Sequence, residues 1–407
     1  MRIRHGRATV TGEPPVTPPY GAVEFIRPSG GKAPAQGDDP EVRRPAPGTC
    51  AVAGDRAARR LLRGKRGRAL ATSQLGATRA IPSKLFWLLG LSALALCLGA
   101  VSLAVGSVPL GPGSIVATLA HPTASGLAHI VVWDIRLPRL AIAACVGAGL
   151  GIAGAMLQAL FRNPLVDPYV TGVSAGAAVA ASASIAFGLS FVLVPAFAFA
   201  GGLACAVVVT AVAAGPEPGA NLRLVLSGIA ISSLCAAVVT IVLLSSGSSD
   251  SLTILGWLAG GIGGKGWSDV ALTACYVAAG SLGALFLVRQ LNVLRLGTEA
   301  AAGLGLRVGR ARFAVLAAAA LIAAACVAVS GIIGFVGLMV PHVARRLVGG
   351  DAVWLLPASA MAGAIVVIVA DAFARGIAAP AELPLGVLLA FVGVPFFLII
   401  ARRPVDL

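Results

Sequence analysis

The chain has 407 residues, of which 58% are hydrophobic and only 12% are charged. Soluble domains carry about 25% charged residues, so this composition excludes an ordinary water-soluble globular protein. The 51 glycines and the many alanines are typical of a multi-pass membrane protein whose helices pack through small residues. The 7 cysteines are scattered singly, which predicts neither a disulfide framework nor a zinc site.

Residues 1–84 differ from the rest of the chain. They hold 16 Lys and Arg against 6 Asp and Glu, are rich in Pro and Gly, and show no apolar period. We therefore predict a disordered cytoplasmic tail. Its stretch RRLLRGKRGR (59–68) suits nucleic acid, an anionic membrane face, or a positive-inside signal before the first span; we favour the last and expect no nucleic-acid partner.

Ten apolar runs follow the tail, and a spanning helix needs ~20 such residues. The boundary at 330–334 is weakly defined, and the short, glycine-rich segment 252–264 suits an interfacial or re-entrant position. Residues 85–407 are thus expected to form an all-α, polytopic membrane domain with about ten transmembrane helices. The runs are roughly 85–105, 139–160, 172–192, 195–214, 224–244, 268–288, 312–331, 332–348, 353–374 and 384–401.

The basic residues of the connecting loops predict the orientation. An even number of spans puts both termini on one side. If that side is cytoplasmic, the inner loops and the C-terminus hold eleven arginines, and the outer loops hold Arg136, Arg139, Lys265 and Arg375. The positive-inside rule then favours a cytoplasmic position for both termini.

The second run carries a small residue at every fourth position, at Ala143, Gly147, Gly151 and Ala155. Positions four apart lie on one face of a helix, so this stripe lets another helix approach closely. The same pattern also follows from a general richness in alanine and glycine. We expect this helix to be buried inside the domain.

The sequence lacks the groups that most enzymes and ion-coupled carriers need. GGIGGKGW (260–267) is the nearest approach to a phosphate-binding loop, but it misses the first glycine and the Ser/Thr position. The four histidines have no metal-binding spacing, so no catalytic residue, metal site or cofactor is expected. Ionisable groups are scarce within the apolar runs, which argues against an ion-coupled secondary transporter. Energy for transport is expected from another subunit.

One loop, LGTEAAAGLGLRVGRAR (296–312), has the composition of a short helix and a turn. The segment 298–302 suits a helix, and Gly303 or Gly305 suits its C-terminal cap. A helix–turn–helix on the inner face would fit a groove on a soluble partner; an ordinary polar loop is the alternative.

Three long segments resemble the FecCD-type permeases, the membrane subunits of ABC importers for ferric siderophores, haem and vitamin B12. They are RLPRLAIAACVGAGLGIAGAMLQALFRNPLVDPYVTGVSAG (136–176), GIIGFVGLMVPHVARRLVG (331–349) and ADAFARGIAAPAELPLGVLLAFVGVPFF (370–397). The resemblance covers about 85–407 and not the tail. It implies the type II ABC importer permease architecture, ten helices per subunit, in a bacterial inner membrane.

The resemblance also implies partners and a cargo. A separate ATP-binding subunit would drive transport, an extracytoplasmic substrate-binding protein would deliver the cargo, and a second permease subunit, identical or different, would complete a dimer in the lipid bilayer. A ferric siderophore-type chelate is the expected cargo, with vitamin B12 (cobalamin) or haem as alternatives. A non-transporting membrane scaffold is a rival of a different class.

Site residues follow from the same resemblance. Loop 296–312 corresponds to the coupling helices that dock the ATPase. The arginines of the RLPR and ADxxAR elements correspond to the docking site for the binding protein; snorkelling interfacial arginines are the alternative. The residues concerned are Glu299, Ala300, Gly303, Leu304 and Gly305 for ATPase coupling, and Arg136, Arg139 and Arg375 for docking.

Two further sets complete the expected site. The fifth span would line the translocation path with one helical face, although plain helix packing gives the same spacing. Segment 162–176 would be an inner-face hinge whose prolines end one helix and shape the next, with caps from Asn and Asp; direct cargo contact stays open. The residues are Ser227, Ile231, Leu234 and Val238 for the path, and Asn163, Pro164, Asp167 and Pro168 for the hinge.

Overall fold

The computed structural model describes residues 83–401, apart from 107, 124, 215–218 and 378–380. Residues 1–82, and with them nearly all of the predicted tail, lie outside the described residues. In the part that is described, every regular element is a helix and no strand is formed. The all-α fold class expected from the apolar runs is confirmed.

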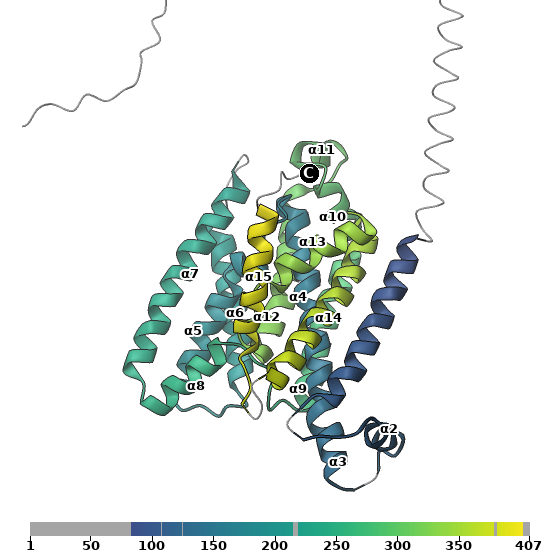
Figure 1. Cartoon of the computed structure of the whole chain (residues 1–407). Helices are drawn as coiled ribbons and strands as arrows, with labels where there is room; N and C mark the ends of the chain where they lie inside the picture. Colours follow the sequence, from purple (N-terminus) through teal and green to yellow (C-terminus); the bar gives the residue numbers. More distant parts are fainter. Residues whose placement is uncertain (1–82, 107, 124, 215–218, 378–380, 402–407) are drawn as a thin grey trace, which may run out of the picture. The chain divides into compact units, whose positions relative to one another are not determined.

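Each of the ten predicted runs coincides with one principal helix. The helices lie side by side, and the axes of most of them are nearly aligned (Figure 1). They are the first described helix Ser83–Ala104, α4 Leu137–Phe161, α5 Val173–Ala186, α6 Val194–Val212, α7 Ala220–Ser245, α9 Trp267–Phe286, α12 Val308–Ser330, α13 Val336–Val348, α14 Ala352–Ile377 and α15 Leu385–Ala401.

Shorter helices occupy the connections at the two ends of these principal helices. Helix α11 marks one end and α2 with α3 marks the opposite end (Figure 1); we call these the α11 end and the α2 end. Segment 252–264, predicted to be interfacial or re-entrant, contributes to α8, which lies at the α2 end. The short elements are α2 Pro112–Ala120, α3 Leu127–His129, η1 Ile130–Arg136, η2 Pro168–Thr171, α8 Ser248–Leu258, α10 Val288–Leu294 and α11 Thr298–Gly303.

The structure supports the expected count of about ten spans only loosely. Seven helices among the described residues are long and apolar enough to cross a membrane. Helices α5, α13 and α15 have only 14, 13 and 17 residues. A helix of 13 residues is ~20 Å long, which is less than the ~30 Å hydrocarbon core.

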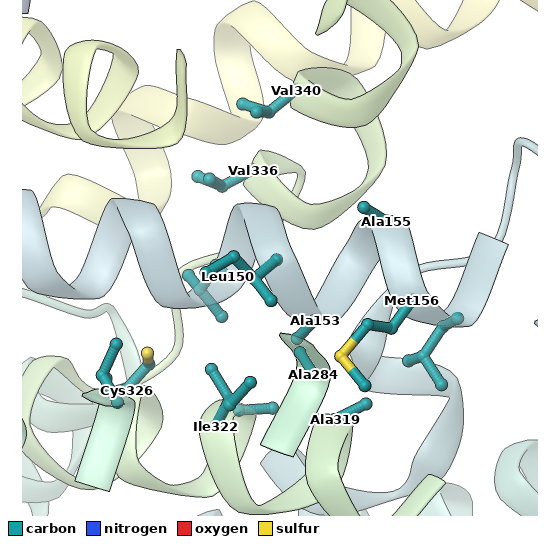
Figure 2. Close-up of a cluster of buried hydrophobic side chains, with 14 of the residues drawn as sticks. Leu150, Ala153, Ala155, Met156, Ala284, Ala319, Ile322, Cys326, Val336 and Val340 are labelled. Carbon is teal, nitrogen blue, oxygen red and sulfur yellow. The ribbon is translucent and has the colours of Figure 1, made fainter. Parts of the chain in front are cut away.

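Helix α4 lies in the centre of the principal helices. Its side chains contact α9 and α12 on one side and α13 on another; Figure 2 shows Leu150 and Met156 of α4 among Ile322 of α12 and Val336 of α13. Leu150, Met156 and Ile322 are at most 2% exposed. The prediction that this helix is buried is confirmed.

Three glycines of α4, two of them in the small-residue stripe, lie against the backbone of two other helices. A methyl group added at Gly147 would overlap the carbonyl group of Gly363 in α14, and one added at Gly151 would overlap that of Ser359. One turn further along, a methyl group at Gly154 would overlap the backbone of Gly337 in α13. Only glycine permits this backbone-to-backbone approach, as the spacing predicts.

The weakly predicted boundary at 330–334 is a break between α12 and α13. Residues 331–335 leave the helical conformation, with positive φ angles of 66° at Gly331 and 68° at Phe335. The carbonyl of Ser330 accepts a hydrogen bond from Gly261 N at 2.8 Å. Non-helical backbone within a membrane is tolerated where protein satisfies its polar groups, and here the last carbonyl of α12 is satisfied by Gly261.

Candidate functional site

Three arginines from distant parts of the sequence lie together at the α2 end. Arg136 ends the π-helical turn Ile130–Arg136, and Arg139 follows in the first turn of α4. Arg375 lies in the last turn of α14. π-helical turns occur frequently at functional sites. All three arginines are buried, with exposed fractions of 5%, 8% and 9% for Arg136, Arg139 and Arg375.

Arg136 and Arg375 hold the C-terminal end of the first described helix. Arg136 donates to the carbonyl oxygens of Leu103 and Val108, each at 2.5 Å. Arg375 donates to the carbonyl and hydroxyl oxygens of Ser102, at 3.1 and 2.7 Å, and to the carbonyl of Val105. The last carbonyls of a helix lack intrahelical donors and favour positive charge. These two guanidinium groups are therefore occupied inside the protein.

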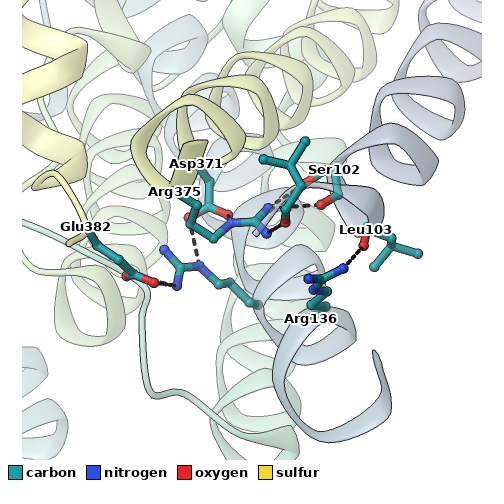
Figure 3. Close-up of polar contacts among 8 residues, drawn as sticks. Ser102, Leu103, Arg136, Asp371, Arg375 and Glu382 are labelled. Carbon is teal, nitrogen blue, oxygen red and sulfur yellow. Dashed lines mark hydrogen bonds and ion pairs between the residues drawn. The ribbon is translucent and has the colours of Figure 1, made fainter. Parts of the chain in front are cut away.

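Arg139 is bound differently, by two carboxylates of unequal exposure, those of Asp371 and Glu382, which are both labelled in Figure 3. Its Nε donates to Asp371 at 2.9 Å, and Asp371 also accepts from Arg375 Nε at 3.0 Å. Its Nη1 donates to both carboxylate oxygens of Glu382, at 2.8 and 2.9 Å. The Asp371 side chain is 2% exposed, whereas that of Glu382 is 49% exposed. One carboxylate is fixed inside the protein, and the other faces out of it.

Two cavities adjoin Arg139. One of about 90 Å³ is lined by the three arginines and Glu382, and one of about 280 Å³ is lined by Asp134, Arg139 and Lys265 among others. Burial lowers the pKa of the Lys265 amine, and Asp269 opposes that shift. The cluster thus offers several cations at a surface that is hollowed beside Arg139.

The sequence identified the three arginines but not their internal partners. Asp371 precedes Arg375 by four residues, a spacing that predicts an ion pair on one helical face. Glu382 gave a weaker signal, as a lone acid in the segment PAELP (380–384). The structure brings the arginines together as expected, and their role in docking stays a prediction.

The predicted coupling loop forms a compact helical turn at the α11 end. Helix α11 spans Thr298–Gly303, and Gly305 follows with a φ of 81°. Leu306 N donates to Ala301 O at 3.0 Å, and Gly305 N donates to Ala302 O at 2.9 Å. This is a Schellman cap, so Gly305 and not Gly303 is the cap glycine.

All five residues predicted to contact the ATPase are exposed on this turn. Ala301 is buried and anchors α11 from below. Helix α10, which precedes this turn in the chain, is joined to the start of α14: Asn292 of α10 donates to Asp351 at 2.7 Å and accepts from Ala352 N at 2.9 Å. The exposed turn therefore follows a helix that is bonded to α14, the helix that carries Asp371 and Arg375 near its other end.

The hinge segment has the expected caps. Asn163 Oδ1 accepts from Leu165 N at 2.9 Å, and Asp167 Oδ1 accepts from Tyr169 N at 3.0 Å. Pro168 begins the short helix η2, and a methyl group at Gly337 of α13 would overlap its ring. The segment is packed against α13; its contact with cargo stays a prediction.

The predicted path residues lie on α7. Ser227 and Ile231 are half-buried, whereas Leu234 and Val238 are 66% and 36% exposed. The stripe follows the edge between the packed and the unpacked face of the helix. Its exposure suits either a path or a contact with another subunit, and the assignment stays a prediction.

The central helix α4 is enclosed by other apolar helices, and the break at 331–335 lies among them. These features are typical of multi-pass membrane proteins that transport solutes. A sequence model of the FecCD transport family matches residues 94–403, and the chain belongs to that family. It is a membrane permease.

Curated relatives are similar over about two thirds of the chain. The cobalamin import system permease protein BtuC of Halobacterium salinarum is 42% identical over 68% of this chain and 74% of its own length. The Fe(3+)-citrate import system permease protein YfmE of Bacillus subtilis is 40% identical over 68% and 84%. The hemin transport system permease protein HmuU of Yersinia pestis is 38% identical over 67% and 83%.

A solved structure is also similar. It shows an inward-facing conformation of an ABC transporter assigned to the metal-chelate type, with a TM-score of 0.70 and 31% identity. The alignment covers 78% of this chain and 99% of the solved chain.

Proposed function

We propose that the chain is the permease subunit of an ABC importer that carries a ferric siderophore-type iron chelate into the cytoplasm. The observation that supports this most is the exposed, capped turn of α11, presented at one end of a FecCD-family permease. Such a ridge fits a groove on an ATPase subunit, which would supply the energy. Relatives named for ferric citrate, hemin and cobalamin make iron chelates and corrinoids the cargo classes to test.

The distribution of arginines supports the orientation. Residues such as Arg295, Arg307 and Arg310 lie at or near the α11 end, so the positive-inside rule favours a cytoplasmic position for that end and an outer position for the arginine cluster. An extracytoplasmic binding protein would dock at the cluster, and a second permease subunit would complete the translocation path along α7.

Reconstitution in proteoliposomes tests the proposal. Vesicles that hold the permease, its ATPase and a binding protein should accumulate labelled ferric siderophore when ATP is present. Parallel assays with hemin and cobalamin decide the cargo class. Uptake driven by a proton gradient without ATP would instead show an ion-coupled carrier, and the proposal would be wrong.

The Schellman cap gives a specific prediction for energy coupling. Gly305→Val forces a β-branched residue to a φ of 81°, at a cost of about 1–2 kcal/mol. The turn should lose its shape, so ATPase co-purification and ATP-driven uptake should both fall.

Gly90→Val is the matched control for this change. Gly90 lies in the first described helix, outside loop 296–312, and an added methyl group would meet nothing within 4 Å, so assembly should stay near wild type. If Gly305→Val assembles and transports as well as Gly90→Val, the turn does not dock the ATPase.

A further inference from the structure

The three clustered arginines differ in what is available to a partner. Arg136 and Arg375 donate to backbone carbonyls at or just beyond the end of the first described helix, and those carbonyls would lose these donors if the arginines turned away. Among the described residues, Arg139 donates to side chains alone, those of Asp371 and Glu382. Exchange of partners is therefore least costly at Arg139.

The two carboxylates on Arg139 also differ. Asp371 is 2% exposed and is shared with Arg375, so it stays in place. Glu382 is 49% exposed, and an ion pair with such a partner contributes little because water screens it. Glu382 is the partner that can leave.

The contact between Glu382 and Arg139 leaves part of the hydrogen-bonding capacity of the guanidinium group unused. Both oxygens of Glu382 share the single nitrogen Nη1, and Nη2 donates to no atom of the residues that the structure describes. A carboxylate that approaches from the cavity could bind Nη1 and Nη2 together, in the bidentate geometry that makes arginine–carboxylate pairs strong. Arg139 lines two cavities, of about 90 and 280 Å³.

We propose that Glu382 is an internal placeholder for an acidic side chain of the docking partner. In the free permease, Glu382 occupies Arg139 and keeps the buried guanidinium paired. On docking, the partner's carboxylate replaces Glu382 on Arg139, and Glu382 moves towards solvent. This inference rests on the proposed docking of a binding protein at the arginine cluster, and it makes Glu382 a residue that sets the strength of that docking.

The test compares docking to permease–ATPase complexes in nanodiscs, with the binding protein that supports uptake in proteoliposomes. Glu382→Gln is nearly isosteric and removes the competing charge, so it should tighten the Kd about two- to fivefold, the equivalent of one partly exposed ion pair. Glu382→Ala should also tighten it. Co-purification of the ATPase checks that each variant is folded.

Asp250→Asn is the matched control, because Asp250 is an acidic residue in the first turn of α8, outside the cluster but at the same α2 end. It reports the effect of removing one negative charge at long range. At about 1 M salt the Debye length is ~3 Å, so this long-range effect should vanish while the tightening in Glu382→Gln remains. Tightening no greater than in the control, or weaker docking in both Glu382 variants, would overturn the placeholder role.

A second measurement separates failure of this inference from failure of the docking site. Phenylglyoxal modifies accessible arginines, and peptide mass spectrometry reads its reaction at Arg139. Reaction should rise in Glu382→Gln and fall when the binding protein is bound. If bound protein leaves Arg139 unprotected, the docking site itself is wrong. If the binding protein protects Arg139 but Glu382→Gln does not lower the Kd, the docking site stands and only the exchange of Glu382 for the partner's carboxylate is rejected.

Discussion

A Gly147→Leu permease should fail to fold, because the backbones of α4 and α14 approach too closely for any side chain at this position. Gly147 and Gly363 face each other, and a methyl group on either one would overlap the carbonyl group of the other. Forcing extra atoms into a packed core costs about 1–3 kcal/mol where side chains can adjust. Here the neighbour is backbone, so we expect a cost at or above the upper end of that range.

Size-exclusion profiles and thermal unfolding in detergent measure this effect. Gly90→Leu is the control: it makes the same substitution in another apolar helix, at an exposed position where an added methyl group meets nothing within 4 Å. Gly90→Leu should stay monodisperse with an unchanged Tm, whereas Gly147→Leu should aggregate or lose yield. Equal behaviour of the two variants would show that α4 and α14 do not cross so closely.

The small-residue stripe shows how much of the packing can be predicted from sequence. Four positions at a spacing of four define one face, and that face does meet another helix. The identity of the opposing helix could not be predicted, because Gly363 lies more than 200 residues further along the chain. Local periodicity gives the face of a helix; the partner depends on the tertiary fold.

The number of spans illustrates a second limit on what can be predicted from the sequence. The length of an apolar run predicts a helix that crosses the bilayer on its own, and these runs identified all ten principal helices. It cannot tell a full span from a shorter helix such as α13, whose N-terminus begins only after the break at 331–335. That break adjoins a hydrogen bond from Gly261 N to Ser330 O, a contact between distant segments that no local pattern contains.

The charged cluster shows the same limit for the site. The resemblance identified Arg139, but its partners Asp371 and Glu382 lie 232 and 243 residues away in sequence. These contacts change the design of experiments. A charge reversal at Arg139 would place a third carboxylate beside two others in a buried position and would destabilise the fold. Variants of Glu382 therefore test docking more cleanly.

The buried ion pairs lead to the last prediction, that Asp371→Asn is far more damaging than its single lost charge suggests. Asp371 is 2% exposed and binds both Arg139 and Arg375 at about 3 Å. Asparagine has nearly the same shape but no charge, so two buried guanidinium groups would face each other without a shared anion. Breaking one partner of a buried pair costs about 3–5 kcal/mol, because the remaining charge cannot return to water.

Glu382→Gln is the matched comparison, since it also converts a carboxylate on Arg139 to an amide. Glu382 is 49% exposed, so its loss should cost only about 0–1 kcal/mol. Thermal unfolding of the two purified variants, measured side by side with wild type, should therefore show a large fall in Tm for Asp371→Asn and a small one for Glu382→Gln. If the two falls are equal, Asp371 is not the fixed anion of the cluster, and the distinction between a permanent and an exchangeable partner on Arg139 fails with it.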